Sequence, residues 1–160
     1  MTETFNAIII GAGQAGPFLA ERLTKAGQTV AIIERDRFGG TCVNTGCMPT
    51  KTLVASARAA HVVRQSDRWG IATSGVTVDM ARVKARADQV IQDARAGLET
   101  WVRDLPGCTV IRGHARFAAP HTISVGDRVL EADRVFINVG GRAAVPDLPG
   151  IETVPVLTNA

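Results

Sequence analysis

The N-terminal part of the chain alternates two apolar runs with a glycine turn and a helical pattern. Residues 7–10 read Ala-Ile-Ile-Ile and residues 30–34 read Val-Ala-Ile-Ile-Glu. Both runs are short and rich in β-branched side chains, which is typical of buried strands. Residues 11–16 supply a turn between them, and a helix-like stretch follows it. The pattern predicts strand, turn, helix and strand, the βαβ opening of an α/β domain.

A pair of longer helical segments follows. Residues 38–49 are rich in Gly, Thr, Asn and Pro, which predicts a loop, and residues 50 to about 68 have an Ala-rich helical pattern. After a turn over residues 69–78, Asp79 is placed to cap a second helix. Apolar residues recur along that helix at helical spacing, which predicts a face packed into the core. They are Met80, Val83, Ala87, Val90, Ile91, Ala94, Leu98, Trp101 and Val102.

The C-terminal third breaks into short β-rich runs. Residues 109–139 contain several such runs separated by Pro, Gly and Asp. This arrangement predicts a small antiparallel sheet and a strand that returns to the first sheet.

Composition narrows the function classes. With 160 residues and 46% hydrophobic side chains, the chain is long enough to form one globular core. The net charge of +3 comes from scattered arginines without a dense basic run, so we expect no nucleic-acid partner. The first ten residues lack the features of a signal peptide or a membrane span, which predicts a cytoplasmic protein. In that reducing compartment, the three cysteines indicate redox chemistry or metal binding.

The glycine turn has the spacing of a dinucleotide-binding loop. Gly11, Gly13 and Gly16 form a GxGxxG between a predicted strand and a predicted helix, and Glu34 ends the second strand. The helix N-terminus would present free N–H groups to a pyrophosphate, and the carboxylate would accept hydrogen bonds from ribose hydroxyls. The alternative is a turn that only packs a helix on a strand. The turn by itself does not distinguish FAD from NAD.

Two cysteines lie in the segment Gly-Gly-Thr-Cys-Val-Asn-Thr-Gly-Cys-Met-Pro-Thr-Lys, residues 39–51. On a regular helix, residues five apart point about 140° away from each other, so Cys42 and Cys47 pair only if the segment between them is irregular. Gly46 supplies that freedom, and Pro49 predicts a helix that begins close to Cys47. Lys51, four residues after Cys47, would place its cation on the same face.

Two other interpretations of the pair remain open. Cys42 and Cys47 are either a redox pair or two reduced buried thiols, and a zinc site would need further ligands. The histidines His61, His114 and His121 show no metal-ligand spacing with the pair, so we predict no resident metal. Cys108 lies in an apolar run and is predicted to be a core residue.

Taken in order, these motifs and the segments Gly-His-Ala-Arg-Phe (113–117) and Phe-Ile-Asn-Val-Gly-Gly-Arg-Ala-Ala-Val-Pro-Asp-Leu-Pro-Gly (136–150) carry a resemblance. The chain resembles the pyridine nucleotide-disulfide oxidoreductases, the family of dihydrolipoamide dehydrogenase, glutathione reductase and mercuric reductase. The resemblance implies an α/β, Rossmann-like FAD-binding three-layer domain with a small antiparallel β-sheet. Residues 1–160 would be the N-terminal portion of the FAD-binding domain, with the family's NAD(P)H-binding and dimerisation domains absent.

The resemblance also assigns residues to the cofactor. It implies that the glycine turn and Glu34 bind the adenosine and pyrophosphate of FAD, and that three residues follow the cofactor toward the flavin: Gly40, Thr41 and Lys51. Ala115 matches the position whose backbone meets the adenine. Gly140 matches the glycine of the family's Ala-Thr-Gly segment, written here Asn138-Val139-Gly140 without the usual threonine.

The implied activity belongs to a longer parent enzyme. In it, electrons pass from NAD(P)H through FAD to a Cys42–Cys47 disulfide and on to a small-molecule or metal-ion substrate. We expect Cys47 on the flavin side and Cys42 in exchange, with Lys51 beside them. The segment 44–52 is most similar to the mercuric reductase branch, in which the two cysteines would contact Hg(II).

Other assignments compete with that one. The alternative within the enzyme class is a dihydrolipoamide dehydrogenase or another disulfide reductase. The alternative of another class is a non-catalytic flavin- or thiol-binding redox-sensing module. We expect the parent enzyme to be a homodimer and this chain alone not to turn over.

Overall fold

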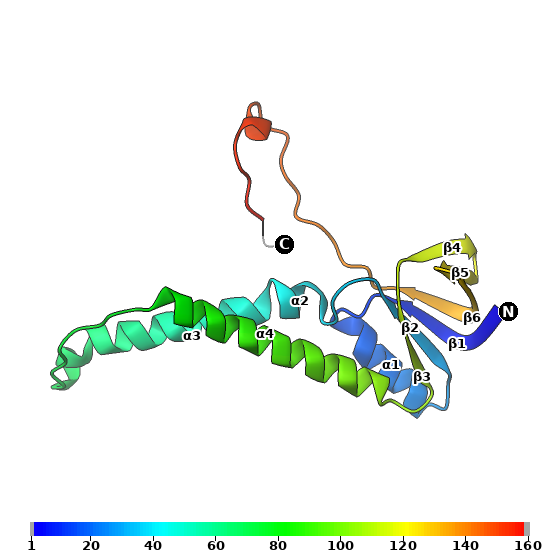
Figure 1. Cartoon of the computed structure of the whole chain (residues 1–160), viewed down its shortest axis with the longest axis horizontal. Helices are drawn as coiled ribbons and strands as arrows, with labels where there is room; N and C mark the ends of the chain where they lie inside the picture. The colour runs from blue at the N-terminus through cyan, green and yellow to red at the C-terminus, as the bar shows by residue number, and fades with distance from the viewer. Residues whose placement is uncertain (1, 159–160) are drawn as a thin grey trace.

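Parallel strands form the centre of the computed structural model, which describes residues 2–158 (Figure 1). They are β1 (Thr2–Ile10), β2 (Val30–Glu34), β3 (Cys108–Arg112) and β6 (Arg128–Ile137), and each is parallel to its neighbour in the order β3-β2-β1-β6. The apolar residues of the two central strands, residues 7–9 of β1 and residues 30–33 of β2, are buried on both faces, as in other covered parallel sheets. The predicted βαβ opening is confirmed, with β1 beginning earlier than the apolar run at residue 7.

The predicted antiparallel strands continue the same sheet. β4 (Ala115–Ala119) pairs with β5 (Thr122–Val125), and β5 pairs with the first part of β6, so the order β3-β2-β1-β6-β5-β4 is unbroken. The sheet curls, so that side chains of β5 reach the core beneath β2 and β3. One buried cluster contains Ile123 and Val125 of β5, Ile33 of β2 and Ile111 of β3. The antiparallel strands therefore cover one face of the parallel strands and form the third layer of the predicted α/β fold.

Helices cover the opposite face. α1 (Ala15–Lys25) and the C-terminal end of α4 (Met80–Arg103) pack on β1 and β2 around Ile9, Ile32 and Val102. The rings of Phe18 and Trp101 join the two helices, with centroids 5.2 Å apart. This apolar layer places the N-terminus of α1 at the carboxyl ends of the strands, where α/β domains carry their sites.

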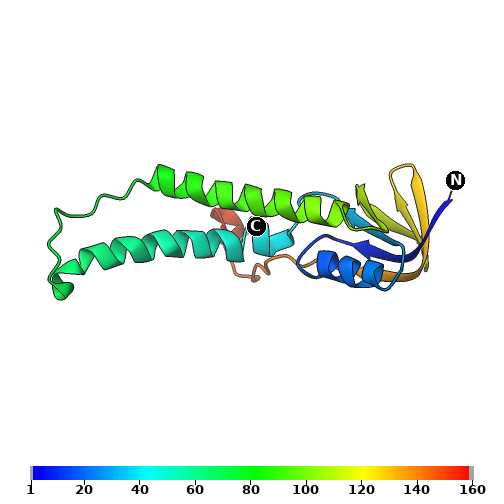
Figure 2. The ribbon, with the colours of Figure 1, turned by 90° about the horizontal axis from the view of Figure 1, so that it is seen from below.

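The predicted loop over residues 38–49 contains a helix. α2 (Gly40–Asn44) is a single short helix within it. α3 (Cys47–Arg64) begins at Cys47, as Pro49 predicts, three residues before the Ala-rich pattern. After the 3₁₀ turn η1 (Ser66–Trp69), the chain returns along α4. Figure 2 shows α3 and the first half of α4 lying side by side and extending away from the sheet.

The apolar stripe of α4 joins the core only in part. Asp79 Oδ1 accepts the backbone N–H of Arg82 at 3.1 Å, which confirms the predicted cap. Val102 is fully buried, but the Met80 side chain is 63% exposed. The prediction that the whole stripe packs into the core was wrong at Met80, because the first half of the helix lies beyond the sheet, beside α3 (Figure 1).

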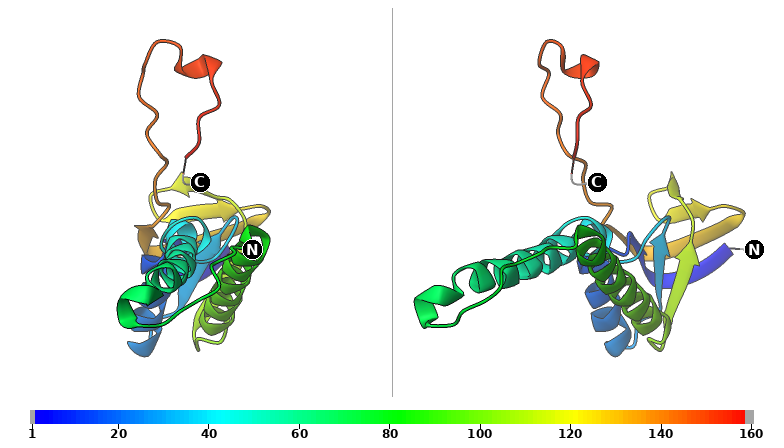
Figure 3. Two further views of the ribbon diagram at one scale, coloured as in Figure 1. Left: turned by 90° about the vertical axis from the view of Figure 1, so that its left-hand side faces the viewer. Right: turned by 60° about the vertical axis from the view of Figure 1, so that its left-hand side comes forward.

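After β6 the chain has little regular structure. Between residues 138 and 158 the secondary structure consists of η2 (Ile151–Thr153), and this segment leaves the sheet in a different direction from the helical hairpin (Figure 3). Within residues 2–158, none of the helices combines the length and the apolar composition needed to cross a membrane.

Candidate active site

The glycine turn is packed too tightly for side chains. A Cβ atom on Gly16 would lie 2.4 Å from the carbonyl oxygen of Gly11, and a Cβ atom on Gly40 would lie 3.0 Å from Cα of Gly13. The first contact joins the start of α1 to the end of β1. The second places the start of α2 directly against the turn. Both contacts lie between backbone atoms, which cannot move aside as a flexible side chain would.

The N-terminus of α1 has the properties of an anion site. Its N-cap residue, Gln14, makes no side-chain capping hydrogen bond, and the first turn contains no acidic residue. The Gln14 amide instead donates to the carbonyl oxygen of Gly39 at 3.4 Å, across the turn. Free backbone N–H groups and the positive end of the helix dipole fit a pyrophosphate. These residues therefore suit the dinucleotide part of FAD.

Glu34 lies where the sequence predicts a ribose-binding carboxylate. Its Oε2 accepts the backbone N–H of Ala12 at 2.9 Å, and its Oε1 accepts the backbone N–H of Asp36 at 2.8 Å. The carboxylate thus orders the glycine turn and the loop after β2 together. Each oxygen keeps a second lone pair with which it can accept a hydroxyl hydrogen.

Asn138 also contacts the turn, and the sequence reasoning assigned it no role. Its backbone N–H continues the pairing with β1 by donating to the carbonyl oxygen of Ile10 at 2.8 Å. Its side-chain Nδ2 donates to the carbonyl oxygen of Gly11 at 3.3 Å. The available signal was a polar residue directly after a buried strand. Asn138 therefore ties β6 to the glycine turn.

The cysteine segment has the predicted irregular geometry. Cys42 lies in α2 and is partly buried, whereas Cys47 is the first residue of α3 and is exposed. Between them, a Cβ atom on Gly46 would lie 3.0 Å from the carbonyl oxygen of Thr41, so the close approach of α2 to α3 requires a small residue. Cys42, Cys47 and Cys108 are all free thiols.

Electrostatic interactions show that the three predicted groups converge. A hydrogen bond with Cys47 raises the pKa of the Cys42 thiol, and burial and repulsion by Cys47 act in the same direction. A hydrogen bond with the Cys47 backbone and the Lys51 cation act the other way and lower the pKa of Cys42, but the net shift is upward. Cys42, Cys47 and Lys51 are therefore within interaction range, although they span a break between two helices.

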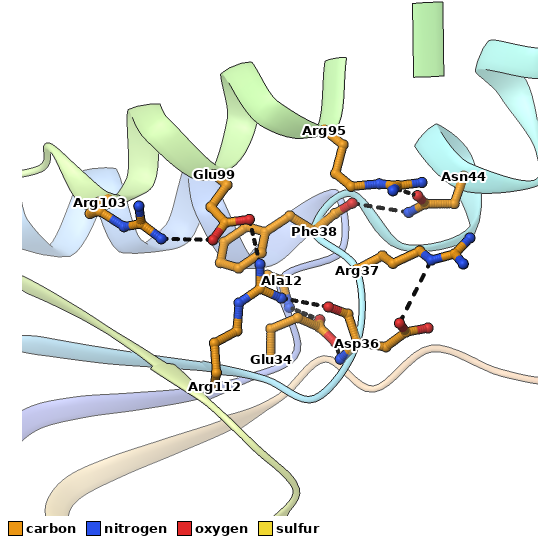
Figure 4. A network of polar contacts seen from close by, with 10 residues as sticks. All are labelled: Ala12, Glu34, Asp36, Arg37, Phe38, Asn44, Arg95, Glu99, Arg103 and Arg112. Carbon is orange, nitrogen blue, oxygen red and sulfur yellow. Dashed lines mark hydrogen bonds and ion pairs between the residues drawn. The ribbon is translucent and has the colours of Figure 1, made fainter. Parts of the chain in front are cut away.

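A polar network extends from Glu34 past Phe38 to Asn44, the last residue of α2 (Figure 4). Arg112 of β3 donates to Glu99 of α4, and its guanidinium carbon lies 4.7 Å from the centre of the Phe38 ring. Arg95, also on α4, donates to the side chain of Asn44 at 2.9 Å. No local pattern predicts these pairings, because they join residues far apart in the chain.

The remaining predicted residues occupy separate places. Ala115 begins β4, close to the site, because Gly113 donates its N–H to the carbonyl oxygen of Glu34 at 3.0 Å. Thr41 lies in α2 beside Cys42, and Gly140 follows β6 with open space around its α-carbon. Among residues 2–158, His, Cys, Asp and Glu form no cluster of three or more that would suit a metal ion.

Cys108 stands apart from the redox segment. It packs against the core cluster beneath α1 and α4, as predicted. Burial raises the pKa of its thiol to about 11, so it stays protonated at neutral pH.

An α/β domain with a tightly packed glycine turn, a carboxylate at the end of the second strand and an adjoining cysteine pair has the arrangement of a dinucleotide-dependent redox protein. The family model described as "Pyridine nucleotide-disulphide oxidoreductase" matches residues 5–159. The chain belongs to this family of flavoprotein disulfide oxidoreductases, as its sequence motifs indicated.

Curated relatives cover several branches of the family. The chain is 37% identical over 157 residues to the probable pyridine nucleotide-disulfide oxidoreductase RclA of Escherichia coli K12, covering 94% of this chain and 32% of RclA. It is 35% identical over 158 residues to the mercuric reductase of Shigella flexneri, covering 94% of this chain and 28% of that protein. It is 31% identical over 153 residues to the dihydrolipoyl dehydrogenase of Acholeplasma laidlawii, covering 95% of this chain and 45% of that protein. The chain thus spans between about a quarter and a half of these relatives.

A solved structure agrees with this assignment. The Cu(II) complex of the HOCl-induced flavoprotein disulfide reductase RclA from Escherichia coli superimposes with a TM-score of 0.75 at 36% identity. The match covers 96% of this chain and 32% of that one. The overall fold and the family are therefore those of flavoprotein disulfide reductases.

Proposed function

We propose that the polypeptide carrying this chain binds FAD in the glycine-turn cradle and performs two-electron redox chemistry at Cys42 and Cys47. The observation that carries the proposal is the contact between the two motifs. The α2 helix, which holds Cys42, starts at Gly40, and a Cβ atom there would lie 3.0 Å from Cα of Gly13 in the phosphate turn. A cofactor bound at the turn and the cysteine pair would therefore share one site.

Each group has a proposed part in binding. The N–H groups at the start of α1 would bind the pyrophosphate, and Glu34 would accept hydrogen bonds from the ribose hydroxyls. The backbone near Ala115 would contact the adenine. Gly40, Thr41 and Lys51 would follow the cofactor toward its reactive ring, and Gly140 would line the opposite side. When bound, FAD would relay an electron pair from NAD(P)H to the protein disulfide.

The cysteine pair would store and transfer that electron pair. Reduction of the Cys42–Cys47 disulfide takes two electrons and two protons and gives two thiols. Cys47, at the N-terminus of α3, would face the flavin, because the helix dipole favours a thiolate there. Cys42 would exchange with the substrate. The hydrogen bond with Cys47 raises the pKa of its thiol, and the Lys51 cation opposes that shift.

We propose a soft metal ion as the substrate, with Hg(II) first. Mercuric reductases from three bacterial groups, those of Shigella flexneri, Bacillus cereus and Acidithiobacillus ferrooxidans, are 35%, 32% and 34% identical to this chain. Two thiolates are good ligands for such ions. Reduction of Hg(II) to Hg(0) would consume the electron pair of one NAD(P)H, which leaves as NAD(P)⁺ and a proton.

Other substrates are candidates for specific reasons. Two RclA structures are Cu(II) complexes, which makes Cu(II) a second metal candidate. The electron pair of one NAD(P)H would reduce two Cu(II) ions to Cu(I). Dihydrolipoyl dehydrogenases are 31% identical to this chain, which makes lipoamide the main disulfide candidate. An assay of the complete polypeptide with NAD(P)H and each of Hg(II), Cu(II), lipoamide and glutathione disulfide separates these substrates. Preferred turnover of lipoamide would overturn the metal-ion proposal.

The cofactor and the disulfide are tested together by absorption spectroscopy. We expect the purified chain, supplied with FAD, to show a flavin band. Titration with dithionite to two electrons should then give a long-wavelength band from charge transfer between a thiolate and the flavin. That band should be absent in Cys47→Ser. A chain that retains no FAD after reconstitution would contradict FAD binding by this segment alone.

The quaternary state and setting are proposed from the family resemblance. We propose that the complete polypeptide is a cytoplasmic homodimer, in which the reducing environment keeps the cysteine pair cycling. Light scattering of the complete polypeptide tests the dimer. A complete polypeptide that binds FAD but turns over none of the substrates would favour a redox-sensing module instead.

A further inference from the structure

We infer that Arg95, acting through the side chain of Asn44, is a positioning residue that holds Cys42 where it can close a disulfide with Cys47. The inference rests on the proposed function, because it concerns the same cysteine pair. It assigns a role to two residues, Arg95 and Asn44, for which the sequence motifs predicted none.

Asn44 is the internal brace of the helix that carries Cys42. It is the last residue of α2, and its Nδ2 donates to the carbonyl oxygens of Phe38 and Gly40, each at 2.9 Å. A helix of five residues is too short to be stable by itself. The orientation of α2 must therefore come from contacts outside its own backbone.

Arg95 supplies such a contact from another element. Its Nε donates to Asn44 Oδ1 at 2.9 Å, across 51 residues of sequence. Because Oδ1 accepts from the guanidinium, the amide nitrogen is turned toward the two carbonyl groups. The bond is partly buried, and water competes less with such a bond than with an exposed one. Arg95 thus determines which way the brace points.

The same long helix also holds the neighbouring segments. Arg86 donates to the carbonyl oxygen of Thr52 at 3.1 Å, which fixes the first turns of α3 beyond Cys47. Glu99 accepts from Arg112, whose guanidinium lies over Phe38, just before α2 (Figure 4). α4 therefore contacts the chain on both sides of the cysteine pair. Arg95 makes the contact with α2, the helix that carries Cys42.

Disulfide geometry makes this positioning chemically relevant. The bond forms only within a narrow range of Cα and Cβ separations, so two cysteines on separate helices depend on how the helices are held. In a glutathione buffer the balanced reaction is protein dithiol plus glutathione disulfide giving protein disulfide plus two glutathione thiols. Loosening α2 should shift this equilibrium toward the dithiol, because the effective concentration of one thiol at the other falls.

The experiment compares two arginine variants of α4 in the 160-residue chain. Arg95→Met removes the donor to Asn44, and Arg82→Met removes an exposed arginine from the same helix. Each protein is equilibrated over a series of glutathione redox buffers, quenched with a maleimide, and scored by mass for dithiol and disulfide. We expect the equilibrium constant for disulfide formation to fall roughly threefold to tenfold in Arg95→Met and to stay unchanged in Arg82→Met.

A second variant keeps the test decisive if Arg95→Met folds poorly. Asn44→Asp retains an acceptor for Arg95 but loses both donations to the backbone, so its equilibrium constant should also fall. Circular dichroism and the urea midpoint report folding in every variant. A merely structural role would lower the midpoint and leave the thiol–disulfide equilibrium of the folded protein unchanged.

The outcomes separate the two proposals. Wild-type protein that forms the disulfide while Arg95→Met and Asn44→Asp match it would overturn the positioning role and leave the proposed function standing. Wild-type protein that forms no Cys42–Cys47 disulfide in the most oxidising buffer would overturn the proposed redox function, and the positioning role with it.

Discussion

Glu34 Oε2 accepts a hydrogen bond from the backbone N–H of Ala12 at 2.9 Å, so the end of β2 is tied to the glycine turn that follows β1. Its second oxygen holds Asp36 in the same way. The residue predicted to bind ribose is therefore also a structural part of the turn that would bind the pyrophosphate.

Substitution of Glu34 should weaken both functions. In Glu34→Gln, an NH₂ group replaces one acceptor oxygen and faces a backbone N–H. We expect the free energy of unfolding to fall by about 1.5–3 kcal/mol, the usual contribution of a hydrogen bond to a charged group. FAD affinity, measured by quenching of flavin fluorescence, should fall as well. Glu131→Gln, at an exposed position of β6, is the control and should change neither value. Equal FAD affinity in the two variants would argue against Glu34 as a ribose ligand.

Two glycine-to-alanine substitutions should have opposite effects on stability. Gly16→Ala places a methyl group 2.4 Å from the carbonyl oxygen of Gly11, and we expect a loss of about 2–3 kcal/mol in the free energy of unfolding. Gly97→Ala lies within α4 with open space around it, and should stabilise the protein by about 0.5–1 kcal/mol. Urea unfolding of the two variants measures both effects. The interpretation of the turn fails if Gly16→Ala is as stable as the wild type.

The pH dependence of Cys42 alkylation should report its two neighbours. The hydrogen bond with Cys47 raises the pKa of Cys42 and the Lys51 cation lowers the pKa. Under reducing conditions, the midpoint for iodoacetamide labelling at Cys42 should move to lower pH in Cys47→Ala and to higher pH in Lys51→Met. Site-resolved mass spectrometry gives the midpoints. Arg58→Met, which removes another cation from α3, the helix of Lys51, is the control. Identical midpoints in all four proteins would contradict the convergence of the three groups.

Cys108 should make stability depend on pH in the alkaline range. Burial raises the pKa of its thiol from about 9 to about 11 in the folded state. Between these values the unfolded chain has already lost the proton that the folded chain keeps, so the free energy of unfolding falls as pH rises. Below pH 9 this contribution is constant. Urea unfolding at several pH values should show a steeper decline in the wild type than in Cys108→Ala. Parallel curves would show that the Cys108 thiol is not protected by burial.

Much of the candidate site was predictable because its determinants are local. The GxGxxG turn between strand and helix, the position of Glu34, and the start of a helix at Cys47 all follow from short-range rules on glycine, proline and β-branched residues. The capping of α4 by Asp79 belongs to the same class. In each case the residues that decide the conformation are within a few positions of one another.

The errors and omissions concern partners that are distant in sequence. The helical periodicity placed Met80 on the apolar face of α4. It did not show that this end of the helix extends beyond the sheet, where the Met80 side chain is 63% exposed. The predicted loop over residues 38–49 contains α2, whose brace, Asn44, is held by an arginine 51 positions away. A helix this short has no strong pattern of its own, because its stability comes from tertiary contacts.

The sequence by itself determined the class of fold, the family, and the chemical groups of the site, because each is encoded in local spacing and residue type. Only the tertiary structure decided that the antiparallel strands curl over the parallel ones and that Asn138 contacts the glycine turn. It also decided that α4 contacts the chain around the cysteine pair through Arg86, Arg95 and Glu99. These features depend on which surfaces meet when the chain folds. A one-dimensional pattern shows that a surface is apolar or charged, but the partner that covers it is selected by packing in three dimensions.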